Sequence, residues 1–227
     1  MRVVVLVSGA GSTMAALLEA SRAADYGATI VAVGADRSDA RGLELARAAG
    51  VATFVVPFAQ YDDRSAWDRA LAERVVDAGA DLVVGAGFMR ILGPPVLRAA
   101  PVVNVHPALL PAFPGAHAVR SALQYGVTVT GATVHFMDEG VDTGPIIAQE
   151  PVAVRADDDE HSLHARIKPV EQRLLVDTVG RLARHGWRVH GRHVHLGSQP
   201  SPSPDSSGSP VSADSPDSPG NTKEEAR

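Results

Sequence analysis

The chain of 227 residues contains no cysteine, few aromatic residues (4%) and no long uninterrupted apolar run. Without cysteine there can be no disulfide framework, thiolate zinc site or cysteine nucleophile. A membrane-spanning helix needs about 20 apolar residues, and the apolar segment before Ser8 is too short even for the core of a signal peptide. We therefore expect a cytoplasmic protein that has no membrane partner and binds no metal.

The net charge of −5 reflects 21 Lys and Arg residues against 26 Asp and Glu residues. The acidic excess is concentrated in residues 197–227, which are rich in serine and proline and offer almost nothing to bury. The remainder is nearly neutral, which argues against nucleic-acid binding. We predict a catalytic domain at 1–196, a disordered acidic tail at 197–227, and small molecules as the only substrates. Whether the chain forms a homodimer stays open.

Short β-branched runs alternate with Ala-, Arg- and Glu-rich segments of helical spacing. Five runs predict strands: Val3–Val7, Thr29–Val33, Thr53–Val56, Leu82–Val84 and Val102–Val105. Such alternation is typical of an α/β fold, an open, mostly parallel, twisted sheet with a Rossmann-like N-terminal half and helices on both faces. Two longer runs, 128–137 and 145–154, predict antiparallel strands that extend this sheet.

A long helix is expected to begin in the acidic segment DDDEHS and to run to about His185, since acids suit the N-terminal end of a helix dipole. A short strand region follows at Trp187–Leu196. Pro169 lies inside the helical pattern, and because its ring removes a backbone hydrogen bond we expect it to kink or split the helix.

The first strand leads into Ser8-Gly9-Ala10-Gly11-Ser12-Thr13, and a helix is expected from about Ser12. Three interpretations stay open. Free N–H groups and the helix dipole suit a phosphomonoester. A dinucleotide site would use Gly9, Gly11 and the later acid Asp36, but Met14 stands where its fingerprint needs a third glycine. The third interpretation is a plain βα turn capped by Ser12.

The segment from Asn104 to Asp142 carries the strongest functional signal. Asn104 and His106 end a predicted strand and should project to the same side, at the edge where parallel sheets bind ligands. A stiff segment, PALLPAFPG, follows, and Asp142 lies further on in the Gly-flanked loop DEGVDTGP. We expect His135, in the strand between them, to be a core or near-site residue rather than a catalyst.

An amide, an imidazole and a carboxylate can together perform acyl transfer without a protein nucleophile. The amide of Asn104 can hold a carbonyl oxygen as it gains negative charge. The imidazole of His106 can support that charge and deliver a proton. The carboxylate of Asp142 favours the charged imidazole and so raises its pKa.

Four segments, SGAGS, AGFMRILGPPVL, NVHPALLPAFPG and VTGATVHFMDEGVDTGPI, resemble the phosphoribosylglycinamide formyltransferases, folate-dependent enzymes of de novo purine (IMP) biosynthesis. The resemblance extends over residues 2–196. It implies transfer of the formyl group of 10-formyltetrahydrofolate to the amino group of 5'-phosphoribosylglycinamide, which gives formylglycinamide ribonucleotide and tetrahydrofolate. It also implies a cis peptide bond between Leu110 and Pro111.

The resemblance assigns a role to each matching residue. His106 is the proton donor, Asp142 raises its pKa, and Asn104 binds the formyl oxygen. The ribonucleotide contacts are expected at Gly11, Ser12, Thr13 (where the family usually has asparagine), Lys168 and Glu171. The folate contacts are expected at Arg64, Met89, Arg90, Ile91, Leu92 and Asn104, with Phe88 adding to an apolar wall for the pterin.

Other activities use similar residues. A formyltetrahydrofolate deformylase uses water as the acceptor, but it usually carries an N-terminal regulatory domain, and none is expected before Val3. A methionyl-tRNA formyltransferase needs a further C-terminal domain and a basic surface, which the acidic tail does not provide. From a different class, a dinucleotide-binding Rossmann protein would rely on Gly9, Gly11 and Asp36.

Overall fold

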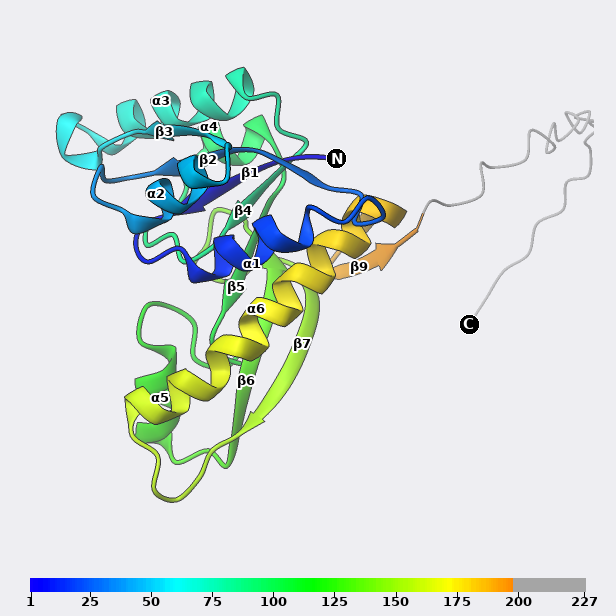
Figure 1. Cartoon of the computed structure of the whole chain (residues 1–227). Coiled ribbons are helices and arrows are strands. Elements are labelled where there is room, and N and C mark those ends of the chain that lie inside the picture. The colour runs from blue at the N-terminus through cyan, green and yellow to red at the C-terminus, as the bar shows by residue number, and fades with distance from the viewer. Residues whose placement is uncertain (198–227) are drawn as a thin grey trace, which may run out of the picture.

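The structure is a computed structural model that describes residues 1–197, so the tail predicted at 197–227 lies outside the described residues except for Gly197. Figure 1 shows its helices and strands. The strands are β1 (Arg2–Val7), β2 (Thr29–Ala35), β3 (Ala52–Val55), β4 (Leu82–Gly85), β5 (Val102–His106), β6 (Val129–Phe136), β7 (Ile146–Ala153), β8 (Trp187–His190) and β9 (His193–Leu196). The helices are α1 (Ser12–Ala20), α2 (Arg41–Ala48), the short 3-10 helix η1 (Phe58–Gln60), α3 (Arg64–Asp77), α4 (Pro94–Ala99), α5 (Ala118–Tyr125) and α6 (Glu160–His185).

Seven strands form one sheet in the order β3-β2-β1-β4-β5-β6-β7. The strands from β3 to β5 are parallel to one another, whereas β6 is antiparallel to β5 and β7 is antiparallel to β6. The predicted α/β fold with a parallel N-terminal half and an antiparallel extension is therefore confirmed. Each β-branched run of the sequence became a strand, with bounds that differ from the prediction by one or two residues.

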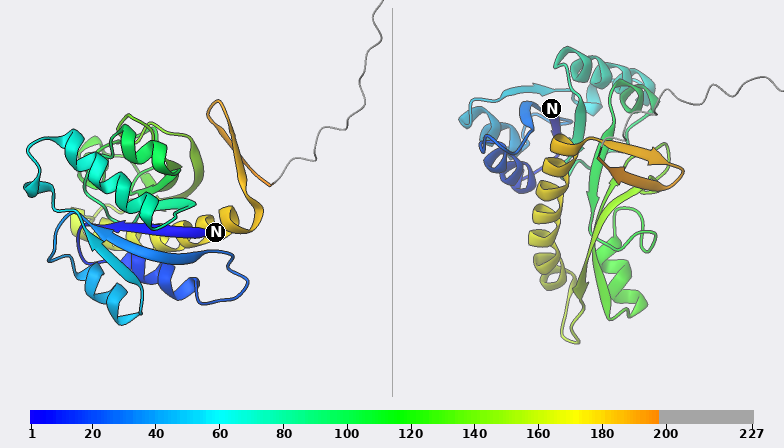
Figure 2. Two further views of the ribbon diagram at one scale, coloured as in Figure 1. Left: turned by 90° about the horizontal axis from the view of Figure 1, so that it is seen from above. Right: turned by 90° about the vertical axis from the view of Figure 1, so that its right-hand side faces the viewer.

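Strand β1 shows why the sheet must be covered on both faces. Successive side chains of a strand point to opposite faces, and in β1 every residue from Val3 to Val7 is fully buried. Val3, Val5 and Val7 belong to one core cluster with residues of α1, α2 and α6. Val4 and Leu6 belong to a second cluster with residues of α3 and α4. The continuous apolar run is thus the signature of a sheet between two helical layers, which Figure 2 shows from above.

Helix α6 runs unbroken from Glu160 to His185 through Pro169, so the predicted split of this helix is wrong. Pro169 is exposed, and the missing N–H costs one hydrogen bond on the solvent side. Both halves of the helix pack on the sheet through one buried stripe: Leu163, Ile167, Leu175, Val179 and Leu182. None of the helices within residues 1–197 is both long and apolar enough to cross a membrane.

Strands β8 and β9 form a separate antiparallel hairpin directly after α6. The base of the hairpin is fixed to the main sheet by Trp187, whose ring centroid lies 5.7 Å from that of Phe136 at the end of β6. Figure 2 shows the hairpin beside the sheet, beyond the end of α6. The predicted strand region at Trp187–Leu196 is therefore present as a two-stranded unit.

Candidate active site

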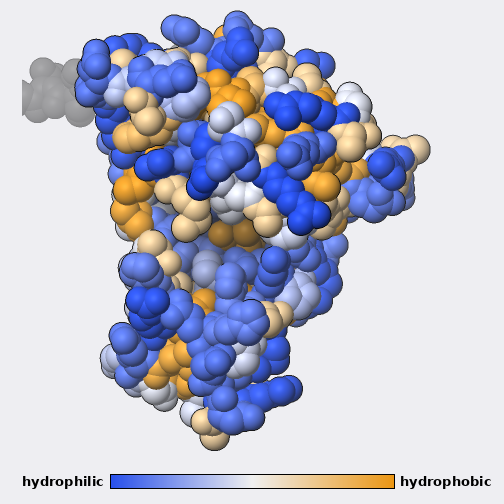
Figure 3. All heavy atoms as spheres, turned by 60° about the vertical axis from the view of Figure 1, so that its left-hand side comes forward, coloured by the Kyte–Doolittle hydropathy of each residue, from blue (hydrophilic) through white to orange (hydrophobic). Residues whose placement is uncertain are grey.

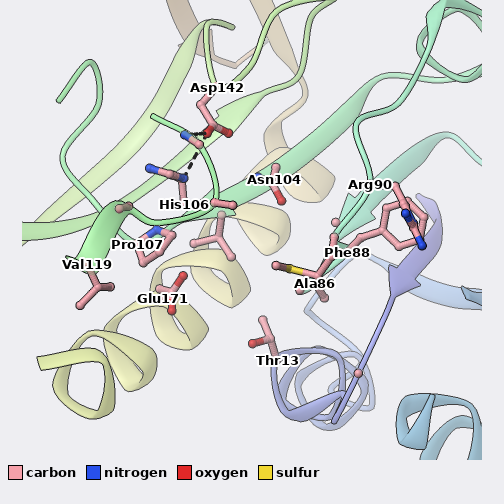
Figure 4. Close-up of a pocket in the computed structure, with 18 of the residues that line it drawn as sticks. Thr13, Ala86, Phe88, Arg90, Asn104, His106, Pro107, Val119, Asp142 and Glu171 are labelled. Carbon is pink, nitrogen blue, oxygen red and sulfur yellow. Dashed lines mark hydrogen bonds and ion pairs between the residues drawn. The ribbon is translucent and has the colours of Figure 1, made fainter. Parts of the chain in front are cut away.

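A cavity of about 450 Å³ opens where β1, β4 and β5 end, the position at which open α/β sheets bind ligands. Figure 3 shows this hollowed face, with apolar surface visible inside the hollow. Its lining comes from the glycine-rich turn, the segment after β4, the end of β5, the loop that carries Asp142, and one side of α6. Figure 4 shows that these distant segments direct side chains toward a common space.

His106 and Asp142 meet at the inner end of this cavity. Nδ1 of His106 lies 3.3 Å from Oδ2 of Asp142, and the side chains are only 5% and 13% exposed. His106 is placed by strand geometry, since it ends β5 opposite Thr133 of β6. Asp142 is placed by the loop between β6 and β7. The structure thus brings together the imidazole and the carboxylate that the sequence places far apart.

The other ring nitrogen of His106, Nε2, lies 2.8 Å from the carbonyl oxygen of Phe113. Both ring nitrogens therefore face acceptors, and only the protonated ring can donate to both. Burial opposes this and lowers the pKa of His106 below its ordinary value, although Asp142 and the Phe113 carbonyl act to raise it. We expected Asp142 to raise this pKa. Its contribution has that direction, but the cost of burying a charge outweighs it.

Asp142 is held from two further sides. The backbone N–H of Gly115 donates to its Oδ2 at 2.8 Å, and Nε2 of His135 lies 3.5 Å from its Oδ1. Burial raises the pKa of Asp142, but His135, the Gly115 N–H and His106 together lower it to about 2. The carboxylate is therefore charged at neutral pH. His135, fully buried, is the near-site residue that we expected from the sequence.

Side-chain hydrogen bonds from the sheet hold the segment that supplies the Phe113 carbonyl. The hydroxyl of Thr133 donates to the carbonyl of Ala108 at 2.6 Å and accepts from the N–H of Leu110 at 3.0 Å. The amide of Gln149 donates to the carbonyl of Leu110 at 2.8 Å. The Leu110–Pro111 peptide bond is cis, as expected from the family resemblance. These hydrogen bonds, buried at Thr133 and partly buried at Gln149, therefore hold the proline-rich segment in place beside His106.

Asn104 lies on the same side of β5 as His106, two residues earlier, and lines the cavity. Its side chain lies directly over Gly85 at the end of β4: a Cβ at Gly85 would be 2.8 Å from Oδ1 of Asn104. A side chain at Gly85 would therefore displace the amide of Asn104. This constraint was not recognised from the sequence.

The glycine-rich turn enters α1 with Gly11 as the N-cap residue, and no side chain caps the helix. The predicted cap at Ser12 is therefore absent. Gly11 has φ of 74°, and a Cβ there would be 2.5 Å from the Cα of Gly42, so both backbone angle and space demand glycine. No acidic residue occupies the first turn of α1. The first N–H groups of α1 have no acceptor within the helix, and Gly11, Ser12 and Thr13 line the cavity, which suits an anion.

Helix α6 contributes Lys168 and Glu171 to the lining of the cavity. Pro169 between them does not remove either residue from the cavity lining. Burial raises the pKa of Glu171 to about 7, while Lys168 acts to lower it. Nε2 of His164 lies 4.0 Å from Oε2 of Glu171. A buried carboxyl poised to ionise near neutrality thus faces the cavity.

Arg90 lies on the far side of the cavity, where its Nε donates to Oδ2 of Asp36 at 2.8 Å. Its guanidinium carbon lies 4.5 Å from the ring centroid of Phe58. The side chain of Asp36 is 3% exposed, and Asp36 is not part of the cavity lining. The acid that a dinucleotide site would need for the ribose is therefore occupied by an arginine.

An apolar surface adjoins Arg90. Met89 is 71% exposed and Ile91 is 46% exposed, whereas the side chain of Leu92 is buried in the second core cluster. The ring of Phe88 stacks on Trp67 with the centroids 6.3 Å apart. Exposed apolar side chains next to a cavity are typical of a ligand-binding wall.

All but one of the predicted site residues line this cavity: Gly11, Ser12, Thr13, Met89, Arg90, Ile91, Leu92, Asn104, His106, Asp142, Lys168 and Glu171. Arg64 is the exception. It begins α3 outside the lining, where it donates to Asp68 and to the carbonyl of Ile91. Within residues 1–197 no group of three or more His, Asp or Glu residues is arranged to hold a metal ion.

The chain is similar to known proteins along most of its length. The formyl transferase family matches residues 1–179. A phosphoribosylglycinamide formyltransferase of Mycobacterium tuberculosis is 54% identical over 198 residues, which cover 86% of this chain and 91% of that protein. The Escherichia coli protein of the same name is 38% identical over 88% of this chain and 95% of its own length. The crystal structure of glycinamide ribonucleotide transformylase 1 from Symbiobacterium toebii has a TM-score of 0.84 and 43% identity, covering 87% of this chain and 94% of that chain.

Proposed function

The chain belongs to the formyl transferase family, and we propose that it transfers the formyl group of 10-formyltetrahydrofolate to the amino group of 5'-phosphoribosylglycinamide, a step of purine biosynthesis. The observation that carries this proposal is the contact between His106 and Asp142, 3.3 Å apart, beside Asn104 at the end of β5. An imidazole, a carboxylate and an amide around one point suit acyl transfer to an amine.

In the proposed reaction, the substrate amine forms a bond to the formyl carbon, and the bond from that carbon to the folate nitrogen breaks. The side-chain amide of Asn104 donates to the formyl oxygen as negative charge develops there. That charge also raises the proton affinity of His106, which counteracts the effect of burial. Delivery of a proton from Nε2 to the departing folate nitrogen requires Nε2 to leave the Phe113 carbonyl. Asp142 accepts, through water, the proton that the amine releases.

The ribonucleotide is assigned to the wall formed by α1 and α6. Its phosphate would lie against the free N–H groups at Gly11, Ser12 and Thr13, with the Thr13 hydroxyl as a further donor. Lys168 and Glu171 face this region from α6. We assign Glu171 to the ribose hydroxyls, because its ionised form offers acceptors without competing hydrogen bonds to other described side chains.

The folate is assigned to the opposite wall. Met89 and Ile91 offer exposed apolar surface for the flat pterin, and backbone groups of residues 89–92 can bind its ring edge. Arg90 is bound to Asp36 through Nε, which leaves its terminal nitrogens to meet a glutamate carboxylate. Arg64 borders this wall through the carbonyl of Ile91. These residues fit a pterin with an anionic tail, and Asn104 links the wall to the formyl group.

The decisive experiment measures formyl transfer from 10-formyltetrahydrofolate to 5'-phosphoribosylglycinamide, with a parallel reaction that contains water as the only acceptor. We expect formylglycinamide ribonucleotide and tetrahydrofolate to appear at equal rates. Formate release that does not depend on the ribonucleotide would instead identify a deformylase.

A thermal-shift comparison distinguishes the proposed formyl transferase from a dinucleotide-binding protein. A ligand that binds only the folded state stabilises it by mass action. A ribonucleotide phosphate and a folate should each raise the melting temperature, whereas NAD should not, because Asp36 is buried and bound to Arg90. A rise with NAD alone would refute the proposed function.

A further inference from the structure

Asp142 lies in an unusual backbone conformation within the loop of residues 138–144. Its φ is 54°, a left-handed region that costs a non-glycine residue free energy unless neighbouring contacts hold it there. The Gly115 N–H and His135 contact its carboxylate, but they do not fix the backbone that carries it. The residues on either side of Asp142 must therefore supply that restraint.

Asp138 and Thr143 close the loop across its base. The hydroxyl of Thr143 donates to Oδ1 of Asp138 at 2.5 Å, and the N–H of Gly140 donates to the same oxygen at 3.0 Å. One carboxylate thus connects the first and last parts of the loop around Asp142. A hydrogen bond to a charged acceptor is stronger than one between neutral groups.

The two glycines of the loop allow this closure. A Cβ at Gly140 would lie 2.0 Å from Oγ1 of Thr143, and one at Gly144 would lie 1.8 Å from the carbonyl oxygen of Phe136. A side chain at Gly144 would therefore collide with the backbone and force the loop open, whereas one at Gly140 would displace the Thr143 hydroxyl that binds Asp138. Glycine is required here by close approach rather than by a positive φ.

A second restraint comes from the C-terminal hairpin. Arg192, at the turn between β8 and β9, donates from Nη2 to the carbonyl oxygen of Thr143 at 3.0 Å. The base of the same hairpin packs through Trp187 on Phe136, which ends the strand before the loop. The hairpin thus contacts the strand that enters the loop and the residue after Asp142.

We propose that Asp138, Thr143 and Arg192 are positioning residues that hold Asp142 against His106, with Asp138 and Thr143 as the inner restraint and Arg192 as the outer one. This inference rests on the proposed function for its kinetic consequences. The geometry to be preserved is the 3.3 Å contact between Asp142 and His106. A catalytic group misplaced by about 1 Å can lower a rate by about 100-fold, so a weak surface contact can matter for turnover more than for stability.

The inner restraint is tested by paired variants. Thr143→Val keeps the shape and removes the hydroxyl donor, whereas Thr143→Ser keeps the donor. Asp138→Ala removes the acceptor, whereas Asp138→Asn keeps an acceptor oxygen. We expect Thr143→Val and Asp138→Ala to lower kcat at least about tenfold with KM for both substrates within about twofold. Thr143→Ser and Asp138→Asn should recover most of the loss.

The outer restraint is tested by Arg192→Ala, with Arg188→Ala as its control. Arg188 is exposed on the same hairpin, and its side chain forms no hydrogen bond or ion pair among residues 1–197. Arg192→Ala removes the donor of a single hydrogen bond to a neutral backbone carbonyl, so we expect kcat to fall about threefold to tenfold. Arg188→Ala should match the wild type.

Hydrogen exchange gives a readout that does not depend on activity. The Gly115 N–H is bonded to Asp142, so its exchange should be at least about threefold faster in Thr143→Val and Arg192→Ala than in Thr143→Ser and Arg188→Ala. Wild-type kcat together with unchanged Gly115 exchange in Thr143→Val would overturn the inference. A wild-type protein without formyl transfer would refute the proposed function, and the exchange result would still decide the positioning role.

Discussion

The carboxylate of Asp142 lies 3.3 Å from the imidazole of His106, although one residue belongs to a loop after β6 and the other ends β5. The same carboxylate lies 3.5 Å from His135, so one negative charge serves two buried imidazoles. This arrangement can stabilise a proton on His106, because a negative charge beside the imidazole favours its protonated form. The reactivity of the site therefore depends on how firmly that single carboxylate is charged and placed.

Loss of either partner should affect turnover rather than binding. We expect His106→Ala and Asp142→Asn to lower kcat by about 100-fold to 10,000-fold, the range of general acid–base catalysis. The folate should still bind within about threefold of the wild-type affinity, because its proposed wall at Met89 and Ile91 is unchanged. Steady-state kinetics and a fluorescence titration with folate provide the two measurements. A kcat within threefold of the wild type for either variant would remove these residues from the mechanism.

The pH dependence of kcat should reveal the interaction between Asp142 and His106 directly. The attacking amine must be neutral, so the rate falls at low pH; His106 must be protonated in the working complex, so the rate also falls as the pH rises through its pKa. Asp142 acts to raise the pKa of His106 against the effect of burial. In Asp142→Asn the alkaline limb of the residual kcat profile should therefore move to lower pH. An alkaline limb that stays in place would show that another group titrates there.

Most of the fold was predictable, because a strand that is buried on both faces of the sheet appears in the sequence as a continuous apolar run. Val3–Val7 has no polar residue, and it could be nothing but a central strand between helices. Pro169 does not split α6, although local propensity favours a break there, because residues of the buried stripe from Leu163 to Leu182 anchor both halves of the helix. Tertiary packing overrides local propensity at such a position.

The arrangement of the proposed catalytic residues was predictable in part. Asn104 and His106 follow from the two-residue period of a strand, and Asp142 follows from its motif. The groups that support these side chains were not predictable. Two are backbone atoms, the carbonyl of Phe113 and the N–H of Gly115. The third is the space left at Gly85, which has no side chain. A sequence pattern does not predict which backbone group will contact a given side chain.

Glu171 should lower the stability of the protein at neutral pH. Its pKa is about 7 in the folded state against 4.5 when unfolded, so its ionisation is disfavoured by folding. Its effect on stability is absent below pH 4.5, grows as the pH rises and is complete above pH 7. Above pH 7 the ionised Glu171 lowers the free energy of unfolding by about 3 kcal/mol, since each unit of pKa shift corresponds to about 1.36 kcal/mol. Glu171→Gln should thus become increasingly more stable than the wild type over this range.

Urea unfolding of the two proteins at pH 4.5 and pH 8 measures this difference. Glu73→Gln, which removes an exposed carboxyl on α3, is the control and should show no such pH dependence. Because Glu171 is assigned to the ribose hydroxyls, the more stable Glu171→Gln variant should also have a higher KM for the ribonucleotide. An equal stability difference at the two pH values would mean that Glu171 is not buried as a neutral carboxyl.

Gly85 should matter to catalysis through the position of Asn104. In Gly85→Ala the new Cβ would lie 2.8 Å from Oδ1 of Asn104, and β4 cannot withdraw because it is paired with β1 and β5. Asn104 must therefore turn away, and kcat should fall by about 100-fold, as for the loss of an oxyanion donor. Since both changes remove the same interaction, the double variant Gly85→Ala, Asn104→Ala should be no slower than Asn104→Ala alone. Additive losses in kcat, measured under one set of conditions, would show that Gly85 acts by a route other than Asn104.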